Sequence, residues 1–492
     1  MKNLTLLFSF LLVPVIAFAG STSLDPDGGI RLNGERWFPL GIYEVPKDAT
    51  EFELFKSTGF DFVRGNADAG FLDQAGEHGF QVWIPLGGFS EVPDEAAKLK
   101  LQAHIQPVQN HPALAIWELP DEALWNCEQT RRAANDKERE TIRQKVNSWI
   151  RGGTGDAELL KNLYRKVSRE HAFRNWKAEE ETIAELWKAL GEPDHQVATN
   201  LSGTFECEEE LYHNLLEGYR TLRSSDPNHL VWQNHAPRNS FDLLQKHAAY
   251  CDAIGCDIYP IPSIQNGHSD LANTRPSSVG DYTERFKKVA PDKATLMVLQ
   301  AFAWKNLHGE FQASTHDDRG REPTYLESRF MAYDSIVRGA NGLCYWGSHS
   351  AGRDSSAWTD LVPVIQELAS IQKFLAAPEA AVPVDIEPQP SWWSIDRPVI
   401  CSARKVGDDW LFILVNEAEG AQDVHLRFPE DFTGKRLYYL YDNQYVDLIE
   451  DAIVPLEFGS LGVRILSTNP DLEVPELRGL SREVPDPFPK HP

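Results

Sequence analysis

Short apolar runs alternate with helical stretches along most of the chain. The runs are rich in β-branched and aromatic residues and lie at 37–43, 60–64, 80–86, 113–119, 229–234, 253–259, 295–302 and 342–346. Near-continuous apolar strands separated by helices indicate a parallel sheet that helices cover on its outer face. Eight such strands, with no Gly-rich phosphate loop after the first, favour a closed barrel over an open sheet. The pattern therefore predicts an α/β fold, a (β/α)8 TIM barrel over residues 28–378.

About a hundred residues separate the fourth and fifth strands, more than one return helix needs. Apolar residues recur there at helical spacing among dense charges, as in Leu159, Leu163 and Val167, and then in Ile183 and Trp187. We expect a helical excursion over residues 127–225. Because it leaves the C-terminal end of a barrel strand, it either walls the barrel mouth or forms an outer helix pair remote from it.

The pattern changes again near the C-terminus. Residues 382–468 alternate between apolar and polar positions, with turn clusters at 407–409 and 419–420, which predicts a small antiparallel β-sandwich. Residues 469–492 are rich in proline and charge, and we interpret them as a tail or an extended strap.

The first nineteen residues have the pattern of a Sec-type signal peptide. Lys2 precedes an apolar stretch, and Ala17 to Ala19 form a small-residue cleavage site. The stretch is shorter than a membrane helix and contains Pro14, and no later segment is apolar enough to cross a bilayer. We therefore expect a secreted or periplasmic protein that is not inserted in a membrane.

The composition of the chain limits the kinds of molecule that the protein can bind. The chain has 492 residues, 42% of them hydrophobic, and 48 Lys and Arg against 73 Asp and Glu, a net charge of −25. Such a field disfavours nucleic acid and anionic lipid, and it does not attract an acidic polymer. Six cysteines are too few for a disulfide framework at this length; Cys127 and Cys207 flank the excursion and are the candidates for a bridge. The spacing of Cys and His fits no zinc site, so we expect no metal and no cofactor, and the sequence indicates no oligomeric state.

The fourth strand carries the most specific chemistry. It runs from His111 to Leu119 and is followed by Pro120, Asp121 and Glu122. A barrel delivers such a residue to its mouth, where a carboxyl group with a raised pKa can protonate a leaving group. Glu122 is therefore the candidate general acid.

This strand resembles that of the clan A glycoside hydrolases, in which an Asn-Glu pair supplies the acid/base. The opening at 30–42 is similar to theirs, and Arg64 matches the second-strand Arg that in family 5 braces the nucleophile. The resemblance also implies sugar contacts for Tyr259 and Trp346 on the sixth and eighth strands. Asp121 departs from it, because Asn stands there in the clan and holds the sugar 2-hydroxyl.

A second departure concerns the nucleophile. The seventh strand ends in Gln300, where the clan has a nucleophilic Glu, and an amide does not form the usual glycosyl ester. Three alternatives stay open: another rim carboxylate acts as base or nucleophile, the substrate's own group attacks, or the barrel only binds glycan. The carboxylate candidates are Asp257 first, and then Glu310, Glu44 and Asp354.

Other side chains at the strand ends suit sugar binding. Gln300 is expected to donate to the sugar if it does not position the attacking group, and His235 and Arg238 to contact hydroxyls or an anionic substituent. The aromatic candidates for stacking on sugar rings are Tyr43, Phe89, Trp125, Trp304 and Trp346, with Trp304 and Trp346 as the first choices. Glu118, inside the barrel, is interpreted as a structural carboxylate paired with a basic group such as Arg64.

Together these features predict an exported glycoside hydrolase that cleaves a poly- or oligosaccharide with Glu122 as general acid/base. One alternative is a catalytically inactive barrel that binds carbohydrate. A weaker one is a sugar-acid lyase or isomerase that uses Glu122 with Tyr259. A second carboxylate about 5–5.5 Å from Glu122 would indicate retention of configuration, one at about 6.5–9.5 Å would indicate inversion, and none within these ranges would favour a barrel that only binds carbohydrate.

Overall fold

The structure, a computed structural model, describes most of the chain from Gly20 onward. The described residues are 20–153, 156–262, 273–307, 320–390, 397–441, 444–448, 452–472 and 474–477. The predicted signal peptide and most of the predicted tail lie outside them.

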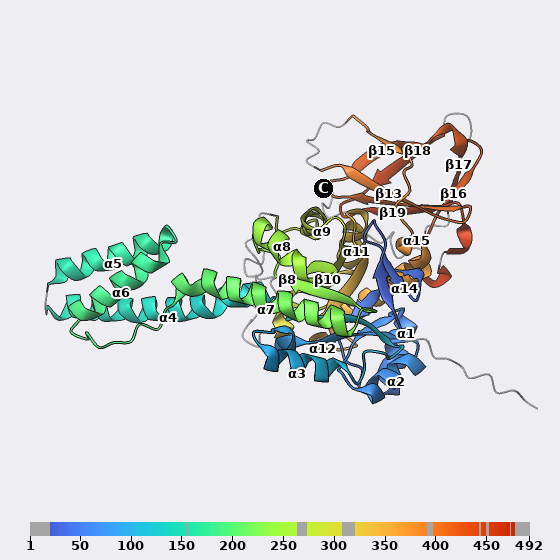
Figure 1. Ribbon diagram of the computed structural model, residues 1–492. Coiled ribbons are helices and arrows are strands. Elements are labelled where there is room, and N and C mark those ends of the chain that lie inside the picture. The colour runs from blue at the N-terminus through green and yellow to red at the C-terminus, as the bar shows by residue number, and fades with distance from the viewer. Residues whose placement is uncertain are drawn as a thin grey trace, which may run out of the picture.

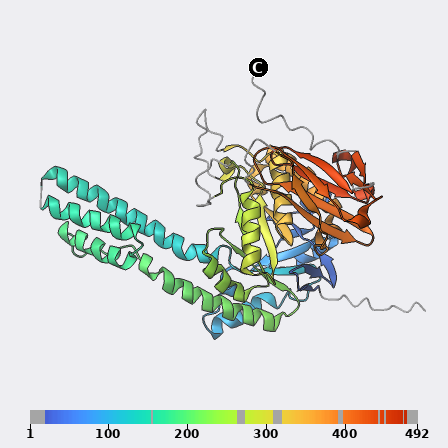
Figure 2. The same cartoon turned by 90° about the horizontal axis from the view of Figure 1, so that it is seen from above.

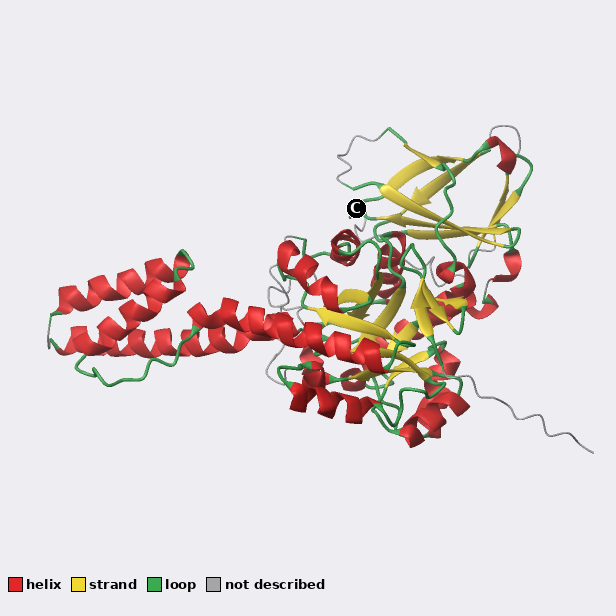
Figure 3. Ribbon diagram, in the orientation of Figure 1, coloured by secondary structure: helices red, strands yellow, loops and turns green. Residues whose placement is uncertain are grey.

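Eight parallel strands close into a barrel, as the sequence predicts (Figure 1 and Figure 3). In chain order they are β4 (Leu40–Ile42), β5 (Phe62–Arg64), β6 (Gln81–Pro85), β7 (Leu114–Glu118), β8 (Leu230–His235), β9 (Ala253–Ile258), β10 (Ala294–Gln300) and β11 (Gly342–Trp346). Each pairs with the next along the chain, and β11 pairs with β4. The C-terminal ends of all eight strands therefore meet at one mouth.

Helices cover the outside of the barrel. They are α1 (Ala49–Thr58), α2 (Ala69–Glu77), α3 (Glu95–Ile105), α7 (Thr204–Ser225), α8 (Phe241–His247), α9 (Ser278–Val289), α11 (Tyr325–Val337) and α14 (Leu361–Ser370). Their ends follow local sequence signals. Asp48 caps α1 by accepting from the N–H groups of Thr50 and Glu51, and Gly59 ends it with φ 107°. Short helices α10 (Trp304–Leu307), α12 (Ser348–Ala351), α13 (Ser356–Thr359) and α15 (Gln372–Ala376) complete the connections.

A small antiparallel sheet closes the other end of the barrel. It consists of β1 (Thr22–Leu24), β2 (Ile30–Leu32) and β3 (Glu35–Trp37). The hydroxyl of Thr22 donates to the main-chain oxygen of Ala115 and accepts from the N–H of Leu230, at the starts of β7 and β8. The apolar run at 37–43 is therefore two strands, since the chain leaves β3 at Trp37 and enters β4 at Leu40.

Side-chain alternation sorts the barrel strands into an interior and an outer layer. The interior cluster includes Phe62, Trp83 and Trp232, whereas Val231 and Met297 belong to the outer core under the helices. Strands β9 and β10 approach closely at Gly255, where a Cβ would lie 1.6 Å from the main-chain oxygen of Leu296. Only glycine fits there, two residues before Asp257.

The helical excursion forms an arm. Helix α4 (Ala123–Gly152) leaves the mouth, α5 (Ala157–Ala172) and α6 (Trp176–Ala189) pack along it, and α7 returns to the barrel. Figure 2 shows the arm projecting well clear of the barrel. Its own apolar core includes Ile142, Leu160, Ile183 and Trp187. The distal part of the arm is thus remote from the barrel mouth, which was the second of the two predicted arrangements. The base of the arm lies beside the mouth.

The C-terminal strands form two antiparallel sheets, as predicted. One has the order β12 (Asp385–Pro388), β15 (Gln422–Arg427), β18 (Ile453–Phe458), and the other β13 (Val399–Val406), β14 (Asp409–Asn416), β19 (Val463–Ser467), β16 (Arg436–Tyr439), β17 (Gln444–Asp447). Phe412, Leu414 and Val454 lie in the core between them. The outer face of the larger sheet packs on the barrel helices, where buried Arg329 of α11 pairs with Glu367 of α14 at 2.8 Å.

Candidate functional site

The barrel mouth gathers most of the residues that the sequence singles out. Asp121 and Glu122 follow β7, Asp257 lies near the end of β9, and Tyr43 and Arg64 come from the ends of β4 and β5. Tyr259, Gln300, Trp304 and Trp346 come from the ends of β9, β10 and β11. The parallel topology alone brings these positions, distant in sequence, to one edge of the sheet.

Glu122 sits at the junction of β7 and α4. Its backbone has φ 48° and ψ 31°, the left-handed region that non-glycine residues rarely occupy. Its N–H donates to the main-chain oxygen of Asn234 at 3.2 Å, which ties the junction to β8. Such a conformation costs about 1 kcal/mol or more and is found preferentially at functional sites.

The carboxyl groups of Glu122 and Asp257 are in hydrogen-bond contact. Burial raises the pKa of Asp257 well above its ordinary value, and the negative charges of Glu122 and Asp121 raise it further. Burial also raises the pKa of Glu122, together with the charge of Asp121. The bond favours neutral Asp257 and ionised Glu122, so Asp257 donates to Glu122. The two groups hold one proton between them, as close carboxyl pairs do.

This contact differs from the arrangement that the sequence predicts. A second carboxylate that acts as base or nucleophile stands opposite the acid, at about 5 Å or more, with the sugar between them. Asp257 instead touches Glu122, so the two act from one side of a bound sugar. Neither retention nor inversion follows from their separation.

The remaining rim carboxylates have other surroundings. Glu44 accepts from the hydroxyl of Ser348 and pairs with Arg353 at 2.7 Å. Asp354 is exposed on the segment after α12, and Glu310 lies outside the described residues.

Asp121 is held in place by Asn234. The Asn234 amide donates to its carboxylate at 2.8 Å. The surrounding walls of the mouth desolvate Asp121 and raise its pKa, although solvent still reaches the side chain, and the charge of Arg64 opposes this rise. Asp121 therefore supplies the negative charge that keeps a proton on the neighbouring pair.

Glu118 is a neutral carboxyl group deep in the barrel. It accepts from Tyr43 at 2.8 Å and from the indole N–H of Trp83 at 3.1 Å. Burial, assisted by the charge of Asp121, raises its pKa to about 8. The predicted ion pair with Arg64 is wrong, because the tyrosine and tryptophan supply its hydrogen bonds and Arg64 acts on it only through its charge.

Gln300 does not have its predicted role. Its side chain is buried, and its carbonyl oxygen accepts from the N–H of Ile261 at 2.9 Å. Its amide donates to the main-chain oxygens of Ile261 and Phe302 at 2.8 and 3.0 Å. Both N–H groups are used within the protein, so Gln300 has no donor left for a sugar or for an attacking substrate group.

His235 does not face the mouth either. Its ring is fully buried, stacks on Phe286 of α9 with centroids 6.1 Å apart, and has its pKa lowered by burial to about 3. The reason is strand alternation, since Trp232 points into the barrel, and Asn234 shares that face while His235 does not. Asn234 was not among the site residues predicted from the sequence, although the same alternation indicates that it faces the mouth.

Aromatic rings form one wall of the mouth. Tyr259 stacks on Trp346 with centroids 5.4 Å apart and an interplanar angle of 18°, and Phe302 meets both rings edge-on. Trp304 packs edge-on against Phe302. Trp304 and Trp346 are half-buried, whereas Tyr259 is buried behind them. Half-buried indoles at a polar mouth suit stacking on the apolar faces of sugar rings.

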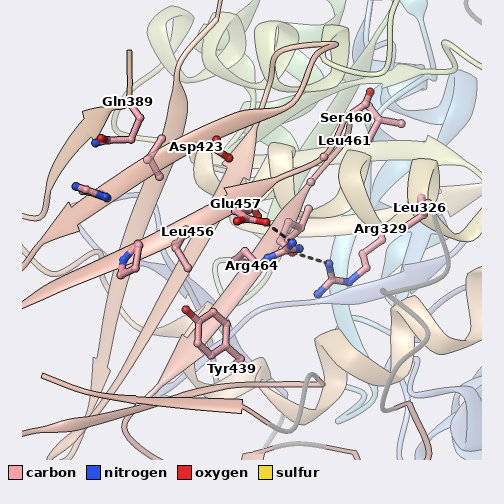
Figure 4. A pocket seen from close by; sticks show the side chains of 16 residues that line it. Leu326, Arg329, Gln389, Asp423, Tyr439, Leu456, Glu457, Ser460, Leu461 and Arg464 are labelled. Atoms are coloured by element: carbon pink, nitrogen blue, oxygen red, sulfur yellow. Dashed lines mark hydrogen bonds between the residues drawn. The ribbon is translucent and has the colours of Figure 1, made fainter. Parts of the chain in front are cut away.

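A separate cavity of about 790 Å³ lies in the sandwich, across β15, β18 and β19 beside α11 (Figure 4). The arginine side chains that line this cavity donate hydrogen bonds to main-chain oxygens. Arg329 and Arg464 both donate to the oxygen of Val463 at 3.2 Å, and Arg464 also donates to that of Glu457 at 2.9 Å. These contacts join the sheet to the barrel, so we place the candidate catalytic site at the barrel mouth.

Comparisons with known proteins agree with this fold. No family model matches the sequence, and no curated protein matches it. Among similar solved structures, a family 5 glycoside hydrolase from Bacteroides vulgatus has 12% identity and a TM-score of 0.52, over 91% of this chain and 93% of that one. A family 42 β-galactosidase from G. stearothermophilus has 11% identity and a TM-score of 0.48, over 87% and 98%. A family 30 endoxylanase from Clostridium papyrosolvens has 10% and 0.43, over 92% and 98%.

The chain therefore has the barrel fold of clan A glycoside hydrolases, followed by a β-sandwich. Within the described residues, no helix is both long and apolar enough for a membrane span.

Proposed function

We propose that this chain is an exported glycoside hydrolase that cleaves glycosidic bonds of a poly- or oligosaccharide, with Glu122 as general acid. The observation that carries the proposal is the contact between the carboxyl groups of Glu122 and Asp257 at the mouth of the barrel, where burial raises the pKa of both. A carboxyl group with a raised pKa can protonate a leaving group.

The chemistry follows from the position of the two carboxyl groups. Glu122 lies at the entrance to α4, and Asp257 passes the one shared proton to it. Glu122 delivers this proton to the glycosidic oxygen as the bond to the anomeric carbon breaks, which leaves both carboxyl groups ionised. A water molecule adds to the anomeric carbon, and its proton restores the pair, so the net reaction is hydrolysis.

The mouth also supplies groups for binding. The Oδ1 atom of Asn234 and the Nε atom of Arg64 are buried and have no hydrogen-bond partner among the described residues. Buried polar atoms of this kind are costly unless a ligand or water satisfies them. Sugar hydroxyls both donate and accept, and the half-buried rings of Trp304 and Trp346 offer a stacking surface beside them.

Gln300 favours a second candidate, a barrel that binds carbohydrate without cleaving it. Its amide is committed to the main chain, so the usual nucleophile is replaced by a structural residue. In this case Glu122 and Asp257 would be hydrogen-bonding groups for the sugar.

A screen of polysaccharides and aryl glycosides separates the two candidates. Wild type is compared with Glu122→Gln and with Asp354→Asn, an exposed rim carboxylate outside the pair. Release of reducing ends by wild type and Asp354→Asn, but not by Glu122→Gln, supports hydrolysis. Glycan binding without products supports the second candidate, and an unsaturated product in mass spectra would indicate a lyase. Mature protein that begins at Gly20 in the periplasm or culture medium supports export.

A further inference from the structure

A second cavity lies in the angle between the arm and the barrel rim. Its volume is about 590 Å³, and its walls come from the first turns of α4, the turn between α5 and α6, the start of α7 and the segment before α8. Helices α4 and α7 pack against each other in this region. Leu124 and Trp125 of its lining follow Glu122 by two and three residues, within one helical turn.

Three aromatic side chains line this cavity. Trp176 and Phe205 stack with centroids 5.8 Å apart and an interplanar angle of 26°, and Trp125 lies under the guanidinium of Arg238 at 4.7 Å. Phe205 is 66% exposed. A solvent-exposed stacked pair of this kind contributes little to the fold, but presents a flat apolar surface that suits a sugar ring.

The charge of the cavity is positive. Arg132, Arg174 and Arg238 line it against Glu128 and Glu208. The two acids are already neutralised, Glu128 by Arg132 and Glu208 by Lys246 at 3.0 Å.

Arg174 supplies charge that no side chain balances. It occupies the α5–α6 turn with φ 54° and has no acidic partner within 4 Å among the described residues. A cation held beside exposed aromatic rings suits a ligand that is itself a sugar and carries an anionic group.

We propose that this cavity binds an acidic stretch of a glycan, carboxylated or sulfated, and so selects acidic polysaccharides as the substrate class. This rests on the proposed function, because the cavity adjoins Glu122 through the first turn of α4. The aromatic rings stack on the sugar, and the guanidinium group of Arg174 binds its anionic substituents. The base of the arm thus forms part of the substrate-binding surface.

The net charge of −25 gives no long-range attraction for an acidic glycan, so the affinity comes from the charges inside the cavity. Interactions between exposed charges fall off beyond about 8 Å at physiological ionic strength. A ligand in the cavity therefore responds to the nearby arginines, whereas the overall field acts on its approach and slows its association.

Affinity electrophoresis tests the proposal without requiring turnover. The background is full-length Glu122→Gln, and the probes are polygalacturonate, its methyl-esterified form, κ-carrageenan and desulfated κ-carrageenan. We expect a charged polymer to retard the protein at least about tenfold more strongly than its uncharged form. Retardation by polygalacturonate alone indicates that the ligand carries carboxylates, and retardation by κ-carrageenan alone indicates that it carries sulfates. Retardation by both polymers indicates that the site recognises negative charge of either kind.

Substitutions locate the binding. Arg174→Ala should weaken binding of the charged polymer about tenfold, whereas Arg151→Ala, an exposed arginine on the distal arm, should not. Trp176→Ala should weaken binding of charged and uncharged forms alike. Equal binding of charged and uncharged polymers, or unchanged binding by Arg174→Ala at an unchanged melting temperature, would overturn the proposal. Because the assay measures no hydrolysis, these results are independent of whether the screen finds an enzyme.

Discussion

Individual side chains at the barrel mouth lower the stability of the fold but provide the pKa values that the proposed reaction needs. Glu122 is held in a left-handed backbone conformation, and its carboxyl group lies against Asp257 and near Asp121. Each of these features costs free energy of folding, since three acidic groups are gathered where water is partly excluded. The same features raise the pKa values of the pair, which is the property that general acid catalysis needs.

Asp257 should control the alkaline limb of the pH profile. The pair holds its last proton to a higher pH than either group alone, because the second ionisation must overcome the first. In Asp257→Asn only burial and the charge of Asp121 still raise the pKa of Glu122, and the new amide stabilises its ionised form. We expect the alkaline limb of kcat/KM to move to lower pH by about 1 unit or more. A limb that stays in place would exclude a shared proton.

Gln300 should respond to substitution as a structural residue. Gln300→Glu replaces an amide that donates to two main-chain oxygens by a carboxylate that repels them. Each lost buried hydrogen bond costs about 1–3 kcal/mol, so thermal unfolding should occur at a clearly lower temperature. If the variant instead kept its stability and gained activity, position 300 would be a nucleophile site and our assignment would be wrong.

Glu118 should make stability depend on pH. Its pKa is about 8 in the folded state and near 4.5 when unfolded, so the folded state keeps a proton that the unfolded state has lost. The free energy of unfolding therefore falls as pH rises from about 4.5 to 8, by a few kcal/mol in all. Glu118→Gln removes this term. The melting temperature of the variant minus that of wild type should therefore be larger at pH 8 than at pH 5. If this difference were the same at both pH values, it would contradict the raised pKa of Glu118.

The sequence predicts these residues unevenly. Motif position brings Glu122, Asp121 and Tyr259 to the mouth, because the end of a parallel strand fixes which edge a side chain reaches. It leaves open which face the side chain takes, as His235 and Asn234 illustrate. It also gives no sign that Gln300 is committed to the main chain, since its partners at Ile261 and Phe302 come from the fold.

At the level of elements, strands were the most predictable. Each barrel strand is a short apolar run that the helices cover from outside, so the apolar composition of the run predicts the strand. The sheet of β1 to β3 was not predicted, because its strands are short and mix polar with apolar residues, whereas the equally short barrel strands β4 and β5 lie in longer apolar runs. Within the arm, periodicity identified helical segments, but their packing depends on buried polar contacts such as that of Glu179 with His171 at 3.0 Å.

The base of the arm offers a test of export. The Sγ atoms of Cys127 in α4 and Cys207 in α7 lie 3.0 Å apart as free thiols. In an oxidising compartment we expect them to form a disulfide that closes a loop of 80 residues and stabilises the arm by about 2–4 kcal/mol.

Peptide mapping of the secreted protein under non-reducing conditions should recover the linked peptides. Cys127→Ser should lower the melting temperature, while Cys401→Ser in the sandwich should not remove the link. Recovery of both cysteines as thiols from the exported protein would contradict this expectation.

The whole molecule combines a barrel, an arm and a sandwich. Their order along the chain follows from changes in hydrophobic period, from mixed strand and helix to helix alone, back to mixed strand and helix, and then to alternation. Their functional relation does not follow from period, because the cavity at the arm base is made by side chains from four separate segments. In this account the barrel supplies the acid, the arm base binds the flanking glycan and the sandwich braces α11 and α14.

Turnover by Glu122→Gln against wild type tests the central claim most directly. Both proteins are assayed on the glycan found by the screen and on an aryl glycoside of the same sugar, whose leaving group needs little protonation. We predict a loss of at least about a hundredfold in kcat/KM on the glycan, a much smaller loss on the aryl glycoside, and no decrease in melting temperature. Equal rates for the two proteins on the glycan would contradict the assignment of Glu122 as the acid.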